Sequence, residues 1–100
     1  MKSSGTILGY QVIIAETFLE RARGLIARPA PSSGEALLIP KCNAIHTFFM
    51  RYTIDAIFLD RDDNPVKTIK NIRPWRLFVW GGWRARKVLE TAAQSDLLPQ

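Results

Sequence analysis

The sequence predicts an α+β fold in which a mostly antiparallel β meander, forming a partly closed sheet, carries one main helix near residues 17–27. Short stretches rich in β-branched and aromatic residues recur along the chain, separated by Gly, Pro, Asn and Asp, which is typical of strands joined by turns. One segment places apolar residues at helical spacing behind a capping sequence. With 100 residues and 47% hydrophobic content, the chain is expected to form a single domain over residues 1–100.

The first part of the chain predicts a strand, the main helix and a second strand. Residues 6–15 are rich in β-branched residues and indicate a strand. Thr17 and Glu20 have the spacing of a capping box, and apolar residues then recur on one face, so a helix is expected over 17–27. Two prolines and a Ser-Gly pair in residues 28–34 predict a loop, and the apolar run that follows predicts a short buried strand at 35–40.

The second part predicts the meander itself. Strands are expected at 45–50 and 55–60, joined by residues 51–54, and a polar turn at 61–64 leads to a third strand at 65–72. Residues 73–83 predict a long loop with Gly81-Gly82 as a flexible point, and residues 86–91 a last strand.

The chain carries a net charge of +5, with 14 Lys and Arg against 9 Asp and Glu. This charge favours anionic partners but says nothing about the fold. Basic residues greatly outnumber acidic ones between Arg61 and Lys87, and the three tryptophans fall between Trp75 and Trp83. The positive charge and the aromatic residues are therefore concentrated in one region.

The single cysteine excludes an internal disulfide framework and a zinc site made of cysteines alone. Residues 1–15 make a poor secretory signal, because Gly9, Tyr10 and Gln11 break the apolar stretch. No run approaches the roughly 18 apolar residues of a membrane span. We therefore expect a soluble chain, cytoplasmic by default, with no membrane partner.

Cys42 and His46 are the first candidates for chemistry, since imidazole can take the thiol proton and a thiolate is a good nucleophile. Four residues along an extended strand span about 13 Å, too far for proton transfer. A buried, inert Cys42 is therefore favoured, and no catalytic residue is assigned. His46 sits in an expected apolar strand, where it is either a hydrogen-bonded structural residue or a residue that faces a pocket.

The acidic residues of the meander favour structural roles. Asp55 is expected opposite Met50 with Arg51 within reach, so a carboxylate that caps the turn is favoured over a general base. Asp60, Asp62 and Asp63 lack the glycine and the distal glutamate of a calcium loop. We expect no metal and no cofactor.

Residues 72–87 mix aromatic side chains with arginines, a composition that suits three roles. A hydrophobic flap is favoured, because Trp is usually buried and Arg usually solvated. A site for a small anion or a sugar-like ligand comes next, and a surface that stacks nucleic-acid bases comes last.

Several motifs together resemble one family. They are Arg23-Gly24-Leu25, His46-Thr47-Phe48-Phe49-Met50, Ile54-Asp55, Pro74-Trp75-Arg76 and Val88-Leu89-Glu90. The chain resembles the bacterial and archaeal "domain of unknown function 192" family, whose motif residues map onto His46, Thr47, Met50, Asp55 and Asp60. The resemblance implies a compact, mostly β, α+β domain and no established activity.

The resemblance also bears on the two ends of the chain. Relatives in this family often have an N-terminal export signal, so an exported mature form stays open. They usually continue after the glutamate with a Leu-Pro-Ala-Gly-like turn, whereas this chain has Thr91-Ala-Ala-Gln94 and ends at Gln100. We therefore expect a final strand that is missing or altered, which would leave an exposed sheet edge through which a homodimer could form.

The function predicted from the sequence is non-catalytic binding of a small anionic or polar ligand in a cleft near His46, roofed by the Trp75–Trp83 segment. The expected contacts are His46 and Thr47 as hydrogen-bonding groups, Asp55, Trp75 as a stacking face and Arg76 as a positive charge. One alternative is a small hydrolase or transferase that uses Cys42 or His46. The other is a binder of single-stranded nucleic acid, which ranks below both.

Overall fold

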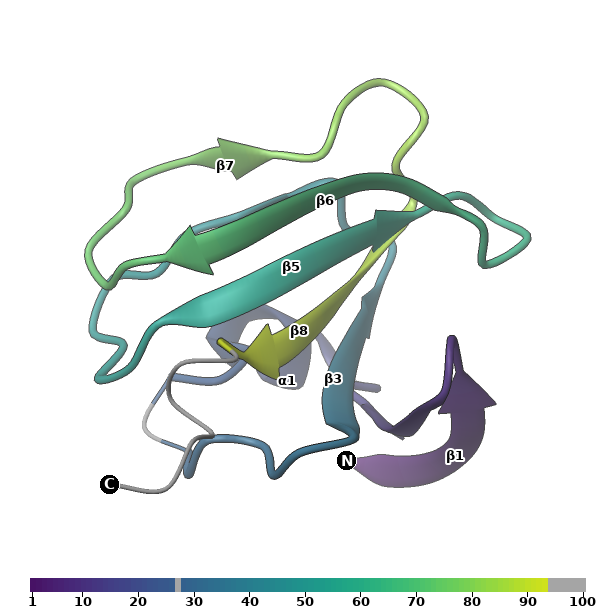
Figure 1. Ribbon diagram of the computed structural model, residues 1–100, viewed down its shortest axis with the longest axis horizontal. Coiled ribbons are helices and arrows are strands. Elements are labelled where there is room, and N and C mark those ends of the chain that lie inside the picture. Colours follow the sequence, from purple (N-terminus) through teal and green to yellow (C-terminus); the bar gives the residue numbers. More distant parts are fainter. Residues whose placement is uncertain (27, 94–100) are drawn as a thin grey trace.

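The computed structural model describes residues 1–26 and 28–93, which form a six-stranded sheet, a two-stranded ribbon and a short helix (Figure 1). The sheet has the order β1-β2-β3-β8-β5-β6. Its bounds are β1 Lys2–Ile7, β2 Tyr10–Ile14, β3 Glu35–Pro40, β5 Ile54–Leu59, β6 Pro65–Ile72 and β8 Lys87–Ala92. The ribbon pairs β4 (Ala44–Ile45) with β7 (Val79–Trp80), and the helix α1 spans Phe18–Arg23.

The sheet is mixed, because β2 and β3 run parallel while the other neighbouring strands run antiparallel. Two parallel strands need a crossover connection, and α1 with the loop after it supplies that connection. The strands expected at 35–40 and 86–91 are confirmed, with β8 shifted by one residue. The strand expected at 6–15 is a hairpin instead, because Leu8 and Gly9 adopt φ values of 52° and 84° and turn the chain back.

The expected meander is correct for β5 and β6 and wrong for residues 45–50. β5 pairs with β6 on one side and with β8 on the other. β4 pairs with β7, which lies inside the segment expected to be a loop. Of the expected 45–50 only Ile45 is in a strand, because β4 ends there. The strand stops there because the N–H and C=O groups of Thr47 bond to Arg76 O and Trp75 N–H, at 2.9 and 2.8 Å, and are not available to β5.

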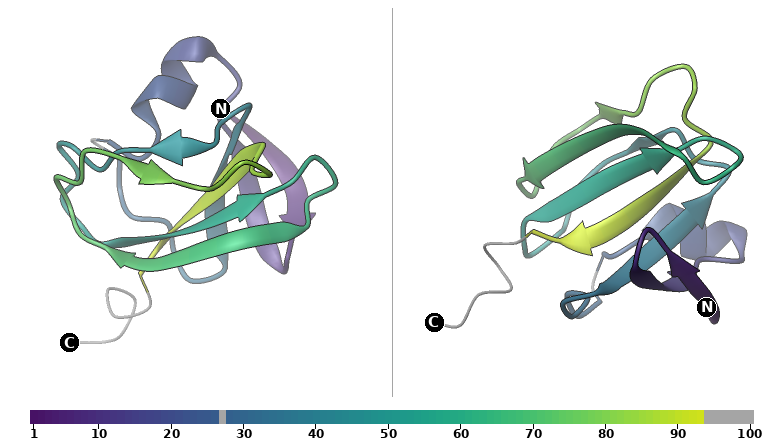
Figure 2. Two further views of the ribbon diagram at one scale, coloured as in Figure 1. Left: turned by 90° about the horizontal axis from the view of Figure 1, so that it is seen from above. Right: turned by 45° about the vertical axis from the view of Figure 1, so that its right-hand side comes forward.

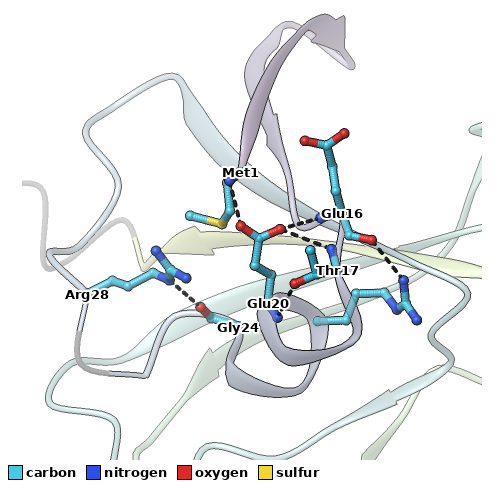
Figure 3. Close-up of polar contacts among 7 residues, drawn as sticks. Met1, Glu16, Thr17, Glu20, Gly24 and Arg28 are labelled. Atoms are coloured by element: carbon cyan, nitrogen blue, oxygen red, sulfur yellow. Dashed lines mark hydrogen bonds and ion pairs between the residues drawn. The ribbon is translucent and has the colours of Figure 1, made fainter.

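The helix is shorter than expected, six residues instead of the predicted 17–27. Its capping box is present, since Glu20 N–H donates to Thr17 Oγ1 at 3.1 Å and Thr17 N–H donates to Glu20 Oε1 at 3.0 Å (Figure 3). The helix ends at Gly24, which has a φ of 54° that favours glycine. Arg28 Nε donates to the Gly24 carbonyl at 2.9 Å and holds the turn beyond the helix end (Figure 3).

The main core lies between the sheet and the ribbon. Seen from above in Figure 2, the ribbon lies on one side of the molecule and β5 with β6 on the other. Ile45 and Val79 of the ribbon belong to the same buried cluster as Ala56, Phe58 and Ile72 of the sheet. A second cluster covers the opposite face of the sheet, with members Val12, Ala36, Leu38, Leu59 and Leu89.

Gly81, directly after β7, sets how closely the ribbon approaches the sheet. A Cβ atom at Gly81 would overlap the ring of Phe58, which is fully buried in β5. The Gly81 N–H also donates to Asn43 O at 2.8 Å and ties the end of β7 to the segment before β4. The change expected at the C-terminus falls largely on residues 94–100, which lie outside the described residues.

We predict that Gly81→Ala lowers the free energy of unfolding by about 1–3 kcal/mol, because the added methyl group overlaps the Phe58 ring. Its φ is not positive, so backbone strain is not the cause. Combining it with Phe58→Leu, which shortens the side chain, should cost less than the sum of the two single changes. Urea unfolding of the four proteins measures this coupling, and strictly additive losses would contradict the contact.

Candidate functional site

A cavity of about 440 Å³ opens between α1 and the sheet, and it is the candidate functional site. Its wall is made by residues 21–26, 39–42 and 44–46, together with Met50 and Glu90. The volume lies in the range of pockets that hold small molecules. The cavity therefore joins three parts of the chain that are far apart in sequence: the end of α1, the start of the ribbon and the central strand β8.

Glu90 contributes a buried carboxyl group to this cavity. Its Cα partners are Leu37 on β3 and Ala56 on β5, so it lies in the middle of the sheet. Only 4% of the residue is exposed, and its Oε1 atom has no hydrogen-bond partner within the protein. A buried polar atom without a partner costs about 1–3 kcal/mol and calls for an explanation.

Gly24 makes room for this carboxyl group. A Cβ atom at position 24 would lie 3.1 Å from Glu90 Oε1 and 3.5 Å from Ile39 Cδ1. The glycine that ends α1 therefore also keeps the space over Glu90 open.

Burial raises the pKa of Glu90 from its ordinary value of 4.5 to about 7. The cause is the loss of water around the carboxylate, which penalises the charged form. Near neutral pH this group can hold or release a proton, so it can act as a hydrogen-bond donor or acceptor toward a bound molecule.

Cys42 lies in the same wall, half-buried, and its thiol donates to Ala44 O at 3.1 Å. Burial raises the pKa of the Cys42 thiol, and the charge of Glu90 raises it further. The thiolate is the nucleophilic form of cysteine, so this environment makes Cys42 a poor nucleophile.

His46 is a solvent-exposed residue of the cavity wall. The sequence placed it inside an apolar strand, but it follows the last residue of β4 and is solvent-exposed. Its Nδ1 atom accepts a hydrogen bond from the Phe48 N–H at 3.2 Å. In the neutral ring the proton must then be on Nε2, which is left as a donor.

The cavity wall also carries positive charge, from Arg21, Arg23 and Lys41. Arg23 and Lys41 are exposed, and Arg21 is half-buried with one guanidinium nitrogen donating to Glu16 O at 3.1 Å. Among the described residues of the wall, Glu90 is the one acidic side chain. The cavity thus combines a buried carboxyl group with basic residues nearer the solvent.

Of the five residues expected to contact a ligand, the structure places only His46 at this cavity. The Thr47 side chain is fully buried and its hydroxyl is engaged, since it donates to Arg73 O at 2.7 Å and accepts from the Arg76 N–H at 2.8 Å. Asp55 accepts from the Asn71 N–H at 2.8 Å, across the β5–β6 hairpin. The expected position of Asp55 opposite Met50 is wrong, because Asp55 pairs with Thr91 of β8 in the sheet. Its carboxylate is bonded to a backbone amide of β6 rather than to the turn at residues 51–54.

Trp75 and Arg76 are exposed, and no residue of 73–83 lines the cavity. The expected roof therefore lies elsewhere, because Trp75 packs against Phe49 and Phe48 rather than against residues of the cavity wall. A ligand-binding role for Thr47, Asp55, Trp75 and Arg76 stays a prediction and is not used below.

Glu90 is a site residue that the sequence alone did not predict. The available signal was its position in the expected strand at 86–91, where a charged residue shares one face with Val88.

Asp60 accepts hydrogen bonds from backbone amides of its own turn, at 2.9 Å from Asp62 N and 3.0 Å from Asn64 N. Within residues 1–26 and 28–93, no three His, Cys, Asp or Glu side chains group as metal ligands would, and no helix is long and apolar enough to cross a membrane.

Comparison with solved structures identifies the same fold in two other proteins. A protein of unknown function from Novosphingobium aromaticivorans superposes with a TM-score of 0.75 at 20% identity, covering 86% of this chain and 65% of that one. A putative transcription regulator from Sinorhizobium meliloti has a TM-score of 0.75 at 18% identity, covering 84% and 69%. At these identities the similarity establishes the fold alone.

Sequence relatives are closer and come from archaea. A UPF0127 protein of Thermococcus sibiricus is 39% identical over 94 residues, which cover 90% of this chain and 60% of that protein. A UPF0127 protein of Pyrococcus horikoshii is 37% identical over 84 residues, which cover 80% and 70%. The chain thus spans less than two thirds of the Thermococcus relative.

The sequence profile of the domain of unknown function 192, described as an uncharacterized ACR family, matches residues 1–95. This match includes β8 and Glu90 as well as His46 and the segments that first suggested the resemblance. The chain therefore belongs to the domain of unknown function 192 family.

Proposed function

We propose that this protein binds a small hydroxylated anion in the Glu90 cavity and does not convert it chemically. The observation that carries the proposal is Glu90 Oε1, a buried oxygen without a partner in the wall of a cavity of about 440 Å³. A bound hydroxyl group could donate to this oxygen and remove the cost of leaving it unpaired.

The basic residues of the wall suggest the second property of the ligand. Arg21, Arg23 and Lys41 supply positive charge, and the Nε2–H of His46 is a further donor. A phosphate or carboxylate group would suit these residues. A ligand with hydroxyl groups at one end and an acidic group at the other would match the deep carboxyl and the basic residues together.

The state of Cys42 supports binding rather than catalysis. Its thiol pKa is raised, so little thiolate is present at neutral pH. The other candidate nucleophile or base, His46, is exposed and accepts a backbone hydrogen bond at Nδ1. The enzyme alternative therefore has no activated nucleophile among the described residues of this wall.

We predict that the ligand-free protein loses stability as the pH rises from about 4.5 to about 7. Because the pKa of Glu90 in the folded protein is above its ordinary value, the folded form binds a proton that the unfolded chain releases in this interval. The loss from this group should reach roughly 3 kcal/mol. Denaturant unfolding across this range measures it, and Glu90→Gln should remove that part of the slope. Parallel curves for the two proteins would contradict the assignment.

We predict that glycerol 3-phosphate or glucose 6-phosphate binds better than glycerol, glucose or inorganic phosphate alone, as measured by isothermal titration calorimetry. Glu90→Leu should weaken binding by about ten-fold or more, since it removes the buried acceptor. This variant should remain folded, because it also removes an unpaired buried polar group.

Lys41→Ala should weaken binding of the phosphorylated probes, whereas the matched change Lys67→Ala, on β6 and away from the cavity wall, should not. Binding that Glu90→Leu leaves unchanged would contradict the proposal.

We predict that iodoacetamide alkylates Cys42 more slowly in the native protein than in the unfolded chain, with a higher apparent pKa. Glu90→Gln should lower that pKa, because the Glu90 charge disfavours the thiolate. Glu35→Gln, at an exposed position, is the control and should leave it unchanged. A native thiol with a lower pKa than the unfolded one would favour the enzyme alternative.

A further inference from the structure

A separate surface, at one end of the molecule, exposes four large apolar side chains. Phe49, Trp75, Leu77 and Phe78 are 64, 60, 73 and 63% exposed. They belong to residues 46–53, between β4 and β5, and residues 73–78, between β6 and β7. Figure 1 places these two loops at the same end of the sheet, and the views in Figure 2 agree. We call the four side chains the aromatic end.

The aromatic end is held in place rather than left unpacked. Thr47 joins the two loops through hydrogen bonds to the backbone of Arg73, Trp75 and Arg76. Phe49 and Trp75 adopt φ values of 64° and 71°, which bulky residues rarely do. Their rings contact each other with centroids 4.9 Å apart. The buried neighbours Met50 and Val79 anchor both loops in the core.

The charged side chains within the two loops have one sign. Arg51, Arg73 and Arg76 are exposed in or beside the two loops, and residues 46–51 and 73–78 contain no aspartate or glutamate. This composition makes an anionic partner favourable. It also disfavours a second copy of the chain at this surface, because two such surfaces would bring six arginines together.

We infer that the aromatic end docks on the surface of an anionic lipid bilayer, with the four apolar side chains in the interface and the arginines near the headgroups. Tryptophan favours this interface, and basic residues are attracted to anionic lipids. Single-stranded nucleic acid fits less well. Leu77 offers no stacking face, and the planes of the Phe49 and Trp75 rings are inclined to each other by 60°, so the two rings do not form one stacking surface.

Docking of the aromatic end on a bilayer surface needs no membrane-spanning segment. The sequence predicted no membrane partner only because it has no apolar run long enough to span a membrane. Docking is also independent of ligand binding in the Glu90 cavity, since no residue of the aromatic end lines that cavity. Surface contact and cavity function can therefore be tested separately.

The test is cosedimentation of the full chain with vesicles of phosphatidylcholine, or of phosphatidylcholine and phosphatidylglycerol in equal parts. We expect binding to the anionic vesicles that weakens with salt. Trp75→Ala combined with Leu77→Ala should lower binding about ten-fold or more, because two apolar groups are lost. Replacing Arg73 and Arg76 with Gln should lower it about five-fold for each arginine.

Trp83→Ala is the matched control. Trp83 is 85% exposed but belongs to residues 81–86, between β7 and β8, which lie at the opposite end of the sheet in Figure 1. This variant and Glu90→Leu should bind vesicles as the unchanged protein does, with folding of every variant checked by urea unfolding.

Three results would overturn the inference. One is no binding to anionic vesicles, and another is an equal loss with Trp83→Ala. The third is Trp75-dependent binding of a single-stranded oligonucleotide at physiological salt with no vesicle binding, which would assign the surface to nucleic acid.

Discussion

Glu90 places a carboxyl group in the middle of the sheet, and the arrangement around it follows from the cost of burying that group. β3 and β5 flank it through Leu37 and Ala56, so backbone pairing holds it on the core face. Gly24 leaves the space beside Oε1 open, and Cys42 lies close enough for the charge of Glu90 to raise its pKa. Desolvation raises the pKa of the Glu90 carboxyl group from 4.5 to about 7.

The adjacent residues His46 and Thr47 connect two different surfaces. His46 lines the cavity, whereas Thr47 is buried and joins the loops of the aromatic end. A motif that is continuous in sequence thus serves two places in the structure. Its apolar neighbours divide in the same way, since Met50 is buried and lines the cavity while Phe49 is exposed.

Local signals in the sequence were sufficient for several elements. The capping box at Thr17 and Glu20 gave the helix start, because both of its hydrogen bonds form within one turn. The β5–β6 hairpin and the buried strand β3 followed from residue pattern and turn composition. The helix end was missed, since it depends on Gly24 adopting a positive φ beside a carboxyl group from β8.

By itself, the sequence determined the family, a mostly β fold, the strands expected at 35–40 and 86–91, and His46 as a residue of interest, but it predicted a longer helix than the six residues of α1. Only the tertiary structure decided that β8 lies between β3 and β5 and that residues 44–45 pair with 79–80. It also decided that Glu90, Gly24, Cys42 and His46 line one cavity. The physical reason is that local patterns report on neighbours within a few residues. An unpaired buried oxygen can be recognised only when every group around it, from distant parts of the chain, is in place.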